Sequence, residues 1–230
     1  MNKEWSDLNK KMQTEIGNKT YFESGITTLI TLRSILFETV RAFFKDLNKD
    51  DFSAIPYINA DGYHNKTIAY SIWHIFRIED IIVNSLIKDD IQIFFTGNYK
   101  KRINSDIITT GNELVKYQIA DFSKKLDLDE LLIYASEVKS KTEESFLRTI
   151  TYNDMKKKFD LNKKEHLRSL NVVSDQPISN WLLDYWCNKD IRGLIKMPLS
   201  RHWIMHIEAC QRIICKLYPK GHPSTRKIII

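Results

Sequence analysis

The chain is poor in the residues that interrupt regular structure, with only 7 glycines and 5 prolines among its 230 residues. Hydrophobic residues make up 43% and aromatic residues 11%, a composition that argues against disorder and for a helix-rich globular chain. Cysteines are few as well: Cys187, Cys210 and Cys215 are odd in number and lack the spacing of a metal-binding motif. We therefore predict no disulfide framework and expect reduced thiols.

Long apolar runs are also missing. No stretch approaches the roughly 18 apolar residues that cross a bilayer, and residues 1–7 lack the apolar core of a signal peptide. We therefore expect a cytoplasmic protein without a membrane partner. The net charge of +6 is typical of a Lys-rich solvated surface. The basic runs 100–102, 156–158 and 163–168 are not interleaved with aromatic residues, so a nucleic-acid partner is not favoured.

Apolar residues recur at helical spacing in four stretches, which predicts an all-α fold built as a four-helix bundle. The predicted helices cover residues 27–48, residues 66–88, residues 127 to about 150, and the stretch from Pro198 to about residue 218. Asp127, with an acidic residue three places on, is the expected N-cap of the third helix. Pro198 suits the first position of the fourth.

These stretches define a single domain over residues 1–230. The core of this domain extends from about residue 27 to residue 218. A leading segment at 1–24 has apolar residues at helix-like spacing, and residues 50–65 are predicted to form a loop. A long crossover at 89–118 and an insertion at about 151–195 separate the helices, and a tail covers 219–230. Residues 178–187 of the insertion read as a short amphipathic helix that lids the core; its tryptophans either line a pocket mouth or serve packing alone.

Three histidines fall on faces where a core would place apolar side chains. His202 and His206 are four residues apart on one stripe of the fourth helix, and His74 lies on the inner stripe of the second. Imidazoles at this spacing are about 6 Å apart at Cβ and can bind one ion. A single inward histidine is usually a hydrogen-bonded core residue. Three of them, two at ligand spacing, favour a metal site.

Two segments, residues 72–80 (IWHIFRIED) and residues 201–206 (RHWIMH), resemble the signature segments of the DinB/YfiT-like family. The resemblance extends weakly over Thr96-Gly97 and residues 126–138, spans roughly residues 27–218, and fails at 151–195. It implies a four-helix fold with a three-histidine metal site, here His74, His202 and His206. Members of this family are often dimers, so it also implies a homodimer.

Three neutral imidazoles leave a divalent ion its full charge and an open coordination position, the arrangement of catalytic rather than structural zinc. We expect zinc or nickel, although imidazole also suits iron and copper. A zinc peptidase is disfavoured because Trp203 stands where its glutamate would directly follow the first histidine.

Other polar residues near the histidines are weaker candidates. Arg77, three residues after His74, is a candidate cofactor-binding residue at the cavity edge, with a salt bridge to Glu79 or Asp80 as the alternative. Those two acids point off the face of His74 and are poor fourth ligands. We expect His64 to be a solvated loop residue and His166 to be exposed among charges, and no general base is identified.

Two functions remain open from the sequence. The resemblance implies a metal-dependent transferase that adds a low-molecular-weight thiol, such as bacillithiol or mycothiol, to a small electrophilic substrate, because a metal-bound thiol is held as the nucleophilic thiolate. The alternative is a stress-response bundle that binds metal or ligand without turnover. An open coordination position beside a solvent-connected cavity would favour the enzyme, and a closed ion the alternative.

Overall fold

The computed structural model describes residues 2–160 and 162–223, and over these ranges the chain is all-helical, without a β-strand. Most of the predicted tail, residues 224–230, lies outside the described residues. No helix in the described ranges has the length and apolar character needed to span a membrane.

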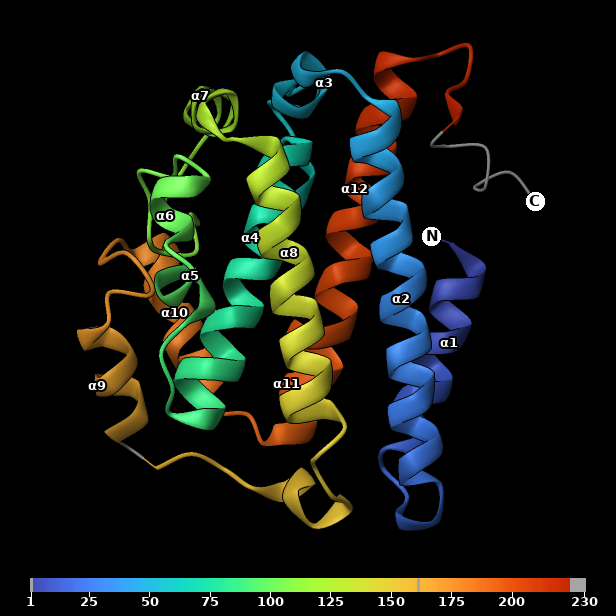
Figure 1. Cartoon of the computed structure of the whole chain (residues 1–230), viewed down its shortest axis with the longest axis vertical. Helices are drawn as coiled ribbons and strands as arrows, with labels where there is room; N and C mark the ends of the chain where they lie inside the picture. The colour runs from blue at the N-terminus through green and yellow to red at the C-terminus, as the bar shows by residue number, and fades with distance from the viewer. Residues whose placement is uncertain (1, 161, 224–230) are drawn as a thin grey trace.

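Four long helices lie side by side and form the body of the molecule (Figure 1). They are α2 (Phe22–Asp46), α4 (Ile68–Asp80), α8 (Leu128–Thr142) and α12 (His202–Leu217). α4 packs against both α8 and α12, and α2 packs against the same two helices, so that the four close into a ring around the core. The leading segment forms α1 (Lys3–Glu15), which runs along the outside of α2.

The N-terminal ends of two long helices follow the sequence signals. The Asp127 side chain accepts a hydrogen bond from the Glu130 amide and caps α8, as predicted. Thr67 caps α4 by accepting from the Tyr70 amide, and its hydroxyl also lies 2.6 Å from that of Ser123. These contacts fix the start of α4, the helix that carries His74.

Three of the long helices extend through π-helical turns. They are η3 (Ile81–Lys88) after α4, η4 (Glu143–Leu147) after α8 and η6 (Met197–Arg201) before α12. The predicted helix at 66–88 is thus confirmed as α4 with η3. α2 begins five residues earlier than the predicted start at residue 27, because the short 3₁₀ turn η1 (Lys19–Tyr21) leads directly into it.

The predicted start of the last helix is wrong. Helical structure already begins with α11 (Ile191–Lys196) and passes through η6, so that Pro198 lies inside a continuous run and not at its first position. A proline in a helix leaves carbonyl groups without an amide donor. In this run the Ser200 hydroxyl donates to the carbonyls of Ile195 and Lys196, at 2.9 and 3.0 Å, and so supports the turn that contains Pro198.

The connecting segments contain more helix than the sequence indicated. The loop at 50–65 holds α3 (Lys49–Ser53) and the 3₁₀ turn η2 (Gly62–His64), and the crossover holds α5 (Ile93–Thr96) and α6 (Tyr99–Arg102), followed by α7 (Tyr117–Lys125). The insertion forms η5 (Tyr152–Lys156), α9 (Asn162–Ser169) and α10 (Pro177–Cys187). The predicted helix at 178–187 is therefore confirmed as α10.

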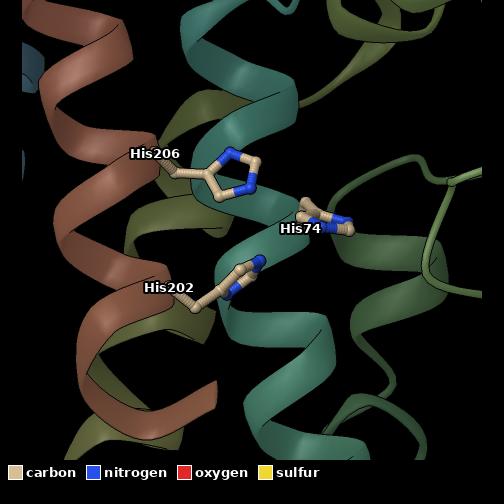
Figure 2. A group of neighbouring side chains, drawn as sticks. All are labelled: His74, His202 and His206. Atoms are coloured by element: carbon tan, nitrogen blue, oxygen red, sulfur yellow. The ribbon is translucent and has the colours of Figure 1, made fainter. Parts of the chain in front are cut away.

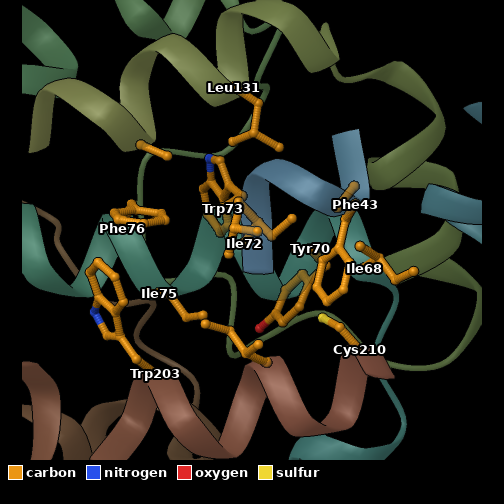
Figure 3. Packing of buried hydrophobic residues seen from close by; sticks show 14 of the residues in the cluster. Phe43, Ile68, Tyr70, Ile72, Trp73, Ile75, Phe76, Leu131, Trp203 and Cys210 are labelled. Atoms are coloured by element: carbon orange, nitrogen blue, oxygen red, sulfur yellow. The ribbon is translucent and has the colours of Figure 1, made fainter. Parts of the chain in front are cut away.

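The core between α4 and α12 is rich in aromatic rings (Figure 3). Phe76 of α4 meets Trp203 of α12 edge to face, with ring centroids 4.8 Å apart, and Trp73 meets Phe122 at 4.9 Å. Such pairs stabilise by about 0.5–1.5 kcal/mol beyond the burial of their area. Because Trp203 directly follows His202, this packing also fixes the rotation of α12 about its own axis.

A buried charge cluster, formed by Arg33, Glu79 and Glu143, joins all four long helices. The Arg33 guanidinium on α2 makes a bidentate pair with Glu79 of α4, at 2.7 and 2.9 Å, and donates to Glu143 at 3.1 Å. It also donates to the Leu199 carbonyl of η6, while the Trp203 indole of α12 donates to Glu79 at 3.0 Å. Arg33 and Glu79 are fully buried.

Candidate metal centre

The three predicted histidines come together at one point, on the side of α4 that faces α12 (Figure 2). His74 lies in the middle of α4, His202 is the first residue of α12, and His206 follows one turn later. All three side chains are buried, with exposed fractions of 5%, 9% and 4%. Two helices that are far apart in sequence thus supply the whole cluster.

The distances within this histidine cluster suit a shared ion. The ring centroid of His74 lies 5.1 Å from that of His202 and 5.0 Å from that of His206, and the latter two are 4.5 Å apart. One ring nitrogen from each residue can be chosen so that all three lie within 4.8 Å of one another. Ligand nitrogens around tetrahedral zinc are about 3.3 Å apart, given Zn–N bonds of about 2.0–2.1 Å.

Hydrogen bonding determines which nitrogen of His74 keeps a lone pair for an ion. Its Nδ1 lies 2.6 Å from the Thr110 carbonyl oxygen, an acceptor, so Nδ1 carries the proton and donates it. The lone pair is therefore left on Nε2. Metal-binding histidines usually have their second nitrogen held in this way by a carbonyl or carboxylate. The Tyr70 ring stacks on His74 at 5.3 Å, with 14° between the planes, and restricts rotation of the imidazole.

The other two histidines have nitrogens without protein partners. Nδ1 of His202 and Nδ1 of His206 are buried, and no hydrogen-bond partner lies within reach among the described residues. A core histidine kept for packing is expected to satisfy its ring nitrogens, because a buried unpaired polar atom costs about 1–3 kcal/mol. The donor set and these unpaired atoms fit a divalent metal ion better than a structural histidine cluster.

Burial also keeps the cluster in its metal-binding protonation state. Desolvation lowers the pKa of His74 to about 4, against the opposing effect of the Thr110 carbonyl and with a further lowering by the charge of Lys66. Desolvation also holds the pKa of His202 and of His206 well below the usual range, and the neighbouring histidines add to the effect. All three imidazoles are thus neutral at pH 7 and keep a lone pair for a ligand bond.

A cavity of about 480 Å³ reaches the histidine cluster. It is enclosed by α4, α10, η6, α12 and the loops around residues 62–66 and 112–115, and all three histidines belong to its lining. Trp181, Leu182, Tyr185 and Trp186 of α10 form one wall. Trp181 is half exposed at 52%. Of the two interpretations of the α10 tryptophans, the structure therefore favours the pocket mouth.

Gly111 holds the loop that supplies the Thr110 carbonyl. Its φ is +73°, in the left-handed region, and a Cβ there would lie 2.7 Å from the Trp73 ring and 3.1 Å from Tyr70. We expect Gly111→Ala to cost about 1–3 kcal/mol of stability and to displace the carbonyl from His74. Because loss of such an outer contact typically weakens metal binding by about 10–100-fold, zinc affinity should fall by that factor in a chelator competition.

The control for this variant is Gly221→Ala. Gly221 also has a left-handed φ, +96°, but nothing lies within 4 Å of its added Cβ. The Gly221→Ala variant should lose stability but keep the zinc affinity of the wild type. Wild-type zinc affinity in Gly111→Ala would show that the Thr110 carbonyl does not orient His74.

Arg77 is fully buried and does not belong to the described lining of the cavity. Its guanidinium donates to Gln92 at 2.9 Å and to the Ile108 carbonyl at 2.5 Å, and lies 3.5 Å from Asp80. The salt bridge weighed from the sequence is therefore present. The cofactor-binding role of Arg77 stays a prediction that these contacts do not favour.

Two further histidines that the sequence analysis considered, His64 and His166, stay outside the cluster. His166 is exposed as predicted, with Nε2 3.6 Å from Asp89. His64 is half-buried and not the fully solvated residue that was predicted, because its ring packs 4.1 Å from that of Tyr63 and its Nδ1 accepts from Arg212 at 3.1 Å. Neither belongs to the three-histidine group found among the described residues.

Sequence reasoning missed Lys66 and Thr110. Lys66, Tyr70 and His74 are four residues apart and therefore lie on the same face of the second helix. Extending that inward face by one turn toward the N-terminus would have identified Lys66. Thr110 contributes a backbone carbonyl, which no side-chain pattern reveals.

A scan of the sequence against protein-family models finds no match, and a search of curated proteins finds none either. The fold and the site thus define an all-helical protein with a buried three-histidine cluster suited to a metal ion.

Proposed function

We propose that this protein is a metal-dependent enzyme for small molecules, built as a four-helix bundle of the DinB/YfiT-like type. The observation that carries the proposal is the position of His74, His202 and His206, buried together at the edge of a cavity of about 480 Å³. A pocket of this size suits a small molecule. A bundle that only binds metal needs no such cavity, so the cavity supports a function that involves a small molecule. A bundle that binds a ligand without turnover would use the same cavity, and the turnover experiment below separates it from the enzyme.

The three histidines would hold zinc or nickel, and such an ion keeps a bound thiol in its nucleophilic thiolate form. Thr110 fixes the tautomer of His74, and Tyr70 fixes its ring plane. The aromatic wall from α10 places apolar surface beside the centre. A substrate that fills the space along this wall would displace water and strengthen electrostatic interactions there.

The reaction that we propose is transfer of a low-molecular-weight thiol to an electrophilic substrate, with bacillithiol as the expected thiol. The described lining of the cavity contains no aspartate or glutamate, so the chain offers no carboxylate base there. A nucleophile that is already deprotonated fits this site better than one that needs such a base. The expected homodimer and the DinB/YfiT-like assignment rest on the sequence resemblance.

A nucleic-acid partner remains the weaker expectation. Several cations of the basic runs pair with acids of the same chain: Arg102 with Glu130 at 2.7 Å, and Lys163 with Asp89 at 2.6 Å. Such pairing leaves less free positive charge for phosphates.

Metal content tests the proposal directly. Protein purified without a histidine tag should contain about one divalent ion per chain by elemental analysis, and a His202→Ala, His206→Ala double variant should contain none. A His64→Ala, His166→Ala double variant removes the same number of imidazoles outside the cluster and should keep the ion. Wild type that binds neither zinc nor nickel after loading would refute the metal site.

The reaction is tested on the metal-loaded protein. With bacillithiol and monochlorobimane, a carbon–sulfur bond forms as chloride leaves, and the product is fluorescent. We expect turnover in wild type and in the His64, His166 control, and none above background in the His202, His206 variant. Fully loaded protein that turned over no electrophile with bacillithiol or mycothiol would contradict the transferase and favour the binding protein.

A further inference from the structure

Lys66 is the one residue with a formal charge at neutral pH among the described residues that line the cavity. The lining otherwise consists of neutral imidazoles, amides, a glycine and a majority of aromatic and aliphatic side chains. A partly buried cation in the wall of a mainly apolar pocket is a feature that selects ligands by charge, since burial strengthens its attraction for an anion.

Lys66 has no anionic partner of its own. Within the described chain no carboxylate lies at ion-pair distance from its Nζ, which lies over the Tyr70 ring, 5.2 Å from the centroid. Burial lowers the pKa of Lys66 to about 8, and no nearby acid offsets this effect. At pH 7 the side chain is still mostly an ammonium ion, partly removed from water and unpaired, a state that an incoming anion would relieve.

The position of Lys66 places this charge beside the histidine cluster. The Tyr70 ring that contacts its ammonium also stacks on His74. The backbone is fixed, because the next residue, Thr67, caps α4. Asn65 and Asn112 line the same cavity, and the Oδ1 atom of each lacks a hydrogen-bond partner among the described residues, so these oxygens can accept from donor groups on the body of a ligand.

Much of the remaining lining of the cavity is apolar. Trp181, Tyr185 and Trp186 of α10 present aromatic surface, and Leu114 and Val115 add aliphatic surface from the loop before α7. Trp181 and Val115 are about half exposed, at 52% and 47%, so the mouth of the cavity is apolar too. A highly polar ligand with several charges would lose hydration against these walls without gaining partners.

We propose that the cavity selects small, mainly apolar acids with a single negative charge, whose carboxylate pairs with Lys66 while the apolar body lies against α10. This inference rests on the proposed function, for which it names the class of the electrophilic substrate. Lys66 is a specificity-determining residue, and the aromatic wall provides binding that does not depend on charge.

A matched pair of probes separates the two contributions. 4-Phenylbutyrate and 4-phenylbutyramide have the same apolar body, but only the acid is charged at pH 7. Titration calorimetry of metal-free wild type should show that the acid binds about 10–100-fold more tightly than the amide, the range expected when a partly buried charge gains a hydrogen-bonded partner. Equal affinities, or no binding of either probe, would overturn the proposal.

Variants then assign the preference to Lys66. Lys66→Met should weaken acid binding to the level of the amide and leave amide binding unchanged, which also shows that the cavity is intact. Lys66→Arg should keep the preference for the acid. Lys216→Met, which removes an exposed lysine on α12, should behave as wild type. A preference for the acid that survives in Lys66→Met would also overturn the proposal.

The outcome is independent of the metal experiment. If the wild type binds no metal but shows the acid preference that depends on Lys66, the proposed metalloenzyme fails while the anion site stands. If the metal binds and acid and amide do not differ, the anion site fails and the metal centre remains. Repeating the titrations with zinc-loaded protein shows whether the ion adds a second contact for the acid.

Discussion

Zinc at a free concentration about 1,000 times its dissociation constant should stabilise the metal-free protein by about 4 kcal/mol. For a chain of this length, that corresponds to a rise in melting temperature of about 8–16 °C. The physical reason is that only the folded chain brings His74, His202 and His206 together. In the unfolded chain, 127 residues lie between His74 and His202. Thermal melts followed by circular dichroism, with and without zinc, measure the shift.

Two variants make this measurement specific to the histidine cluster. The shift should disappear in His202→Ala, His206→Ala and persist in His64→Ala, His166→Ala, and excess EDTA should reverse it in wild type. Equal shifts in both double variants would mean that zinc stabilises the protein through some other site. Binding to the unfolded chain would reduce the shift, because only the difference in affinity between the two states stabilises.

Arg33→Met should destabilise the protein by about 3–5 kcal/mol, the cost of leaving a buried charge without its partner. Glu79 is fully buried, and without Arg33 it would keep the Trp203 indole as a hydrogen-bond donor. Glu143 is affected less, because Lys139 also pairs with it at 2.9 Å. Urea denaturation of the wild type and the variant gives the change in the free energy of unfolding, provided that both show the same dependence on urea concentration.

The same helix offers a control for this variant. Arg41 lies on α2 and faces solvent, with its Nε 3.8 Å from Glu38. Arg41→Met should change stability by no more than about 0.5 kcal/mol, since exposed ion pairs contribute little. Adding Glu79→Gln to Arg33→Met should restore part of the loss, because it removes the unpaired charge. A loss below about 1 kcal/mol in Arg33→Met would show that water reaches Glu79 and compensates for the missing guanidinium.

The long helices and the metal cluster could be predicted because their signals are local. Apolar stripes at spacings of three and four mark α2, α4, α8 and α12, and the spacing of His202 and His206 is itself a property of one helix turn. His74 could be placed opposite them because its helix and theirs each direct one face toward the same core. The three residues predicted as ligands are the three that the structure brings together.

The surroundings of the cluster depend on contacts between distant segments, which periodicity does not encode. The wall of the cavity comes from α10, inside the insertion at 151–195 where the sequence pattern broke down. Arg33 lies on an otherwise apolar face, and its partner Glu79 is 46 residues away. A charged residue on an apolar helix face cannot be predicted to form a buried ion pair until its partner on another helix is known.

The three π-helical turns converge on the buried charge cluster: Glu143 belongs to η4, the Leu199 carbonyl that Arg33 binds belongs to η6, and η3 begins two residues after Glu79. A π turn holds one residue more than an α turn, so each is a place where the chain can gain or lose a residue without breaking a helix. Such a change in η6 would rotate α11 by about 100° relative to α12 and leave the interval from His202 to His206 intact. In evolutionary terms, η6 is a place where the position of α10, which forms one wall of the cavity, can change while His202 and His206 keep their spacing.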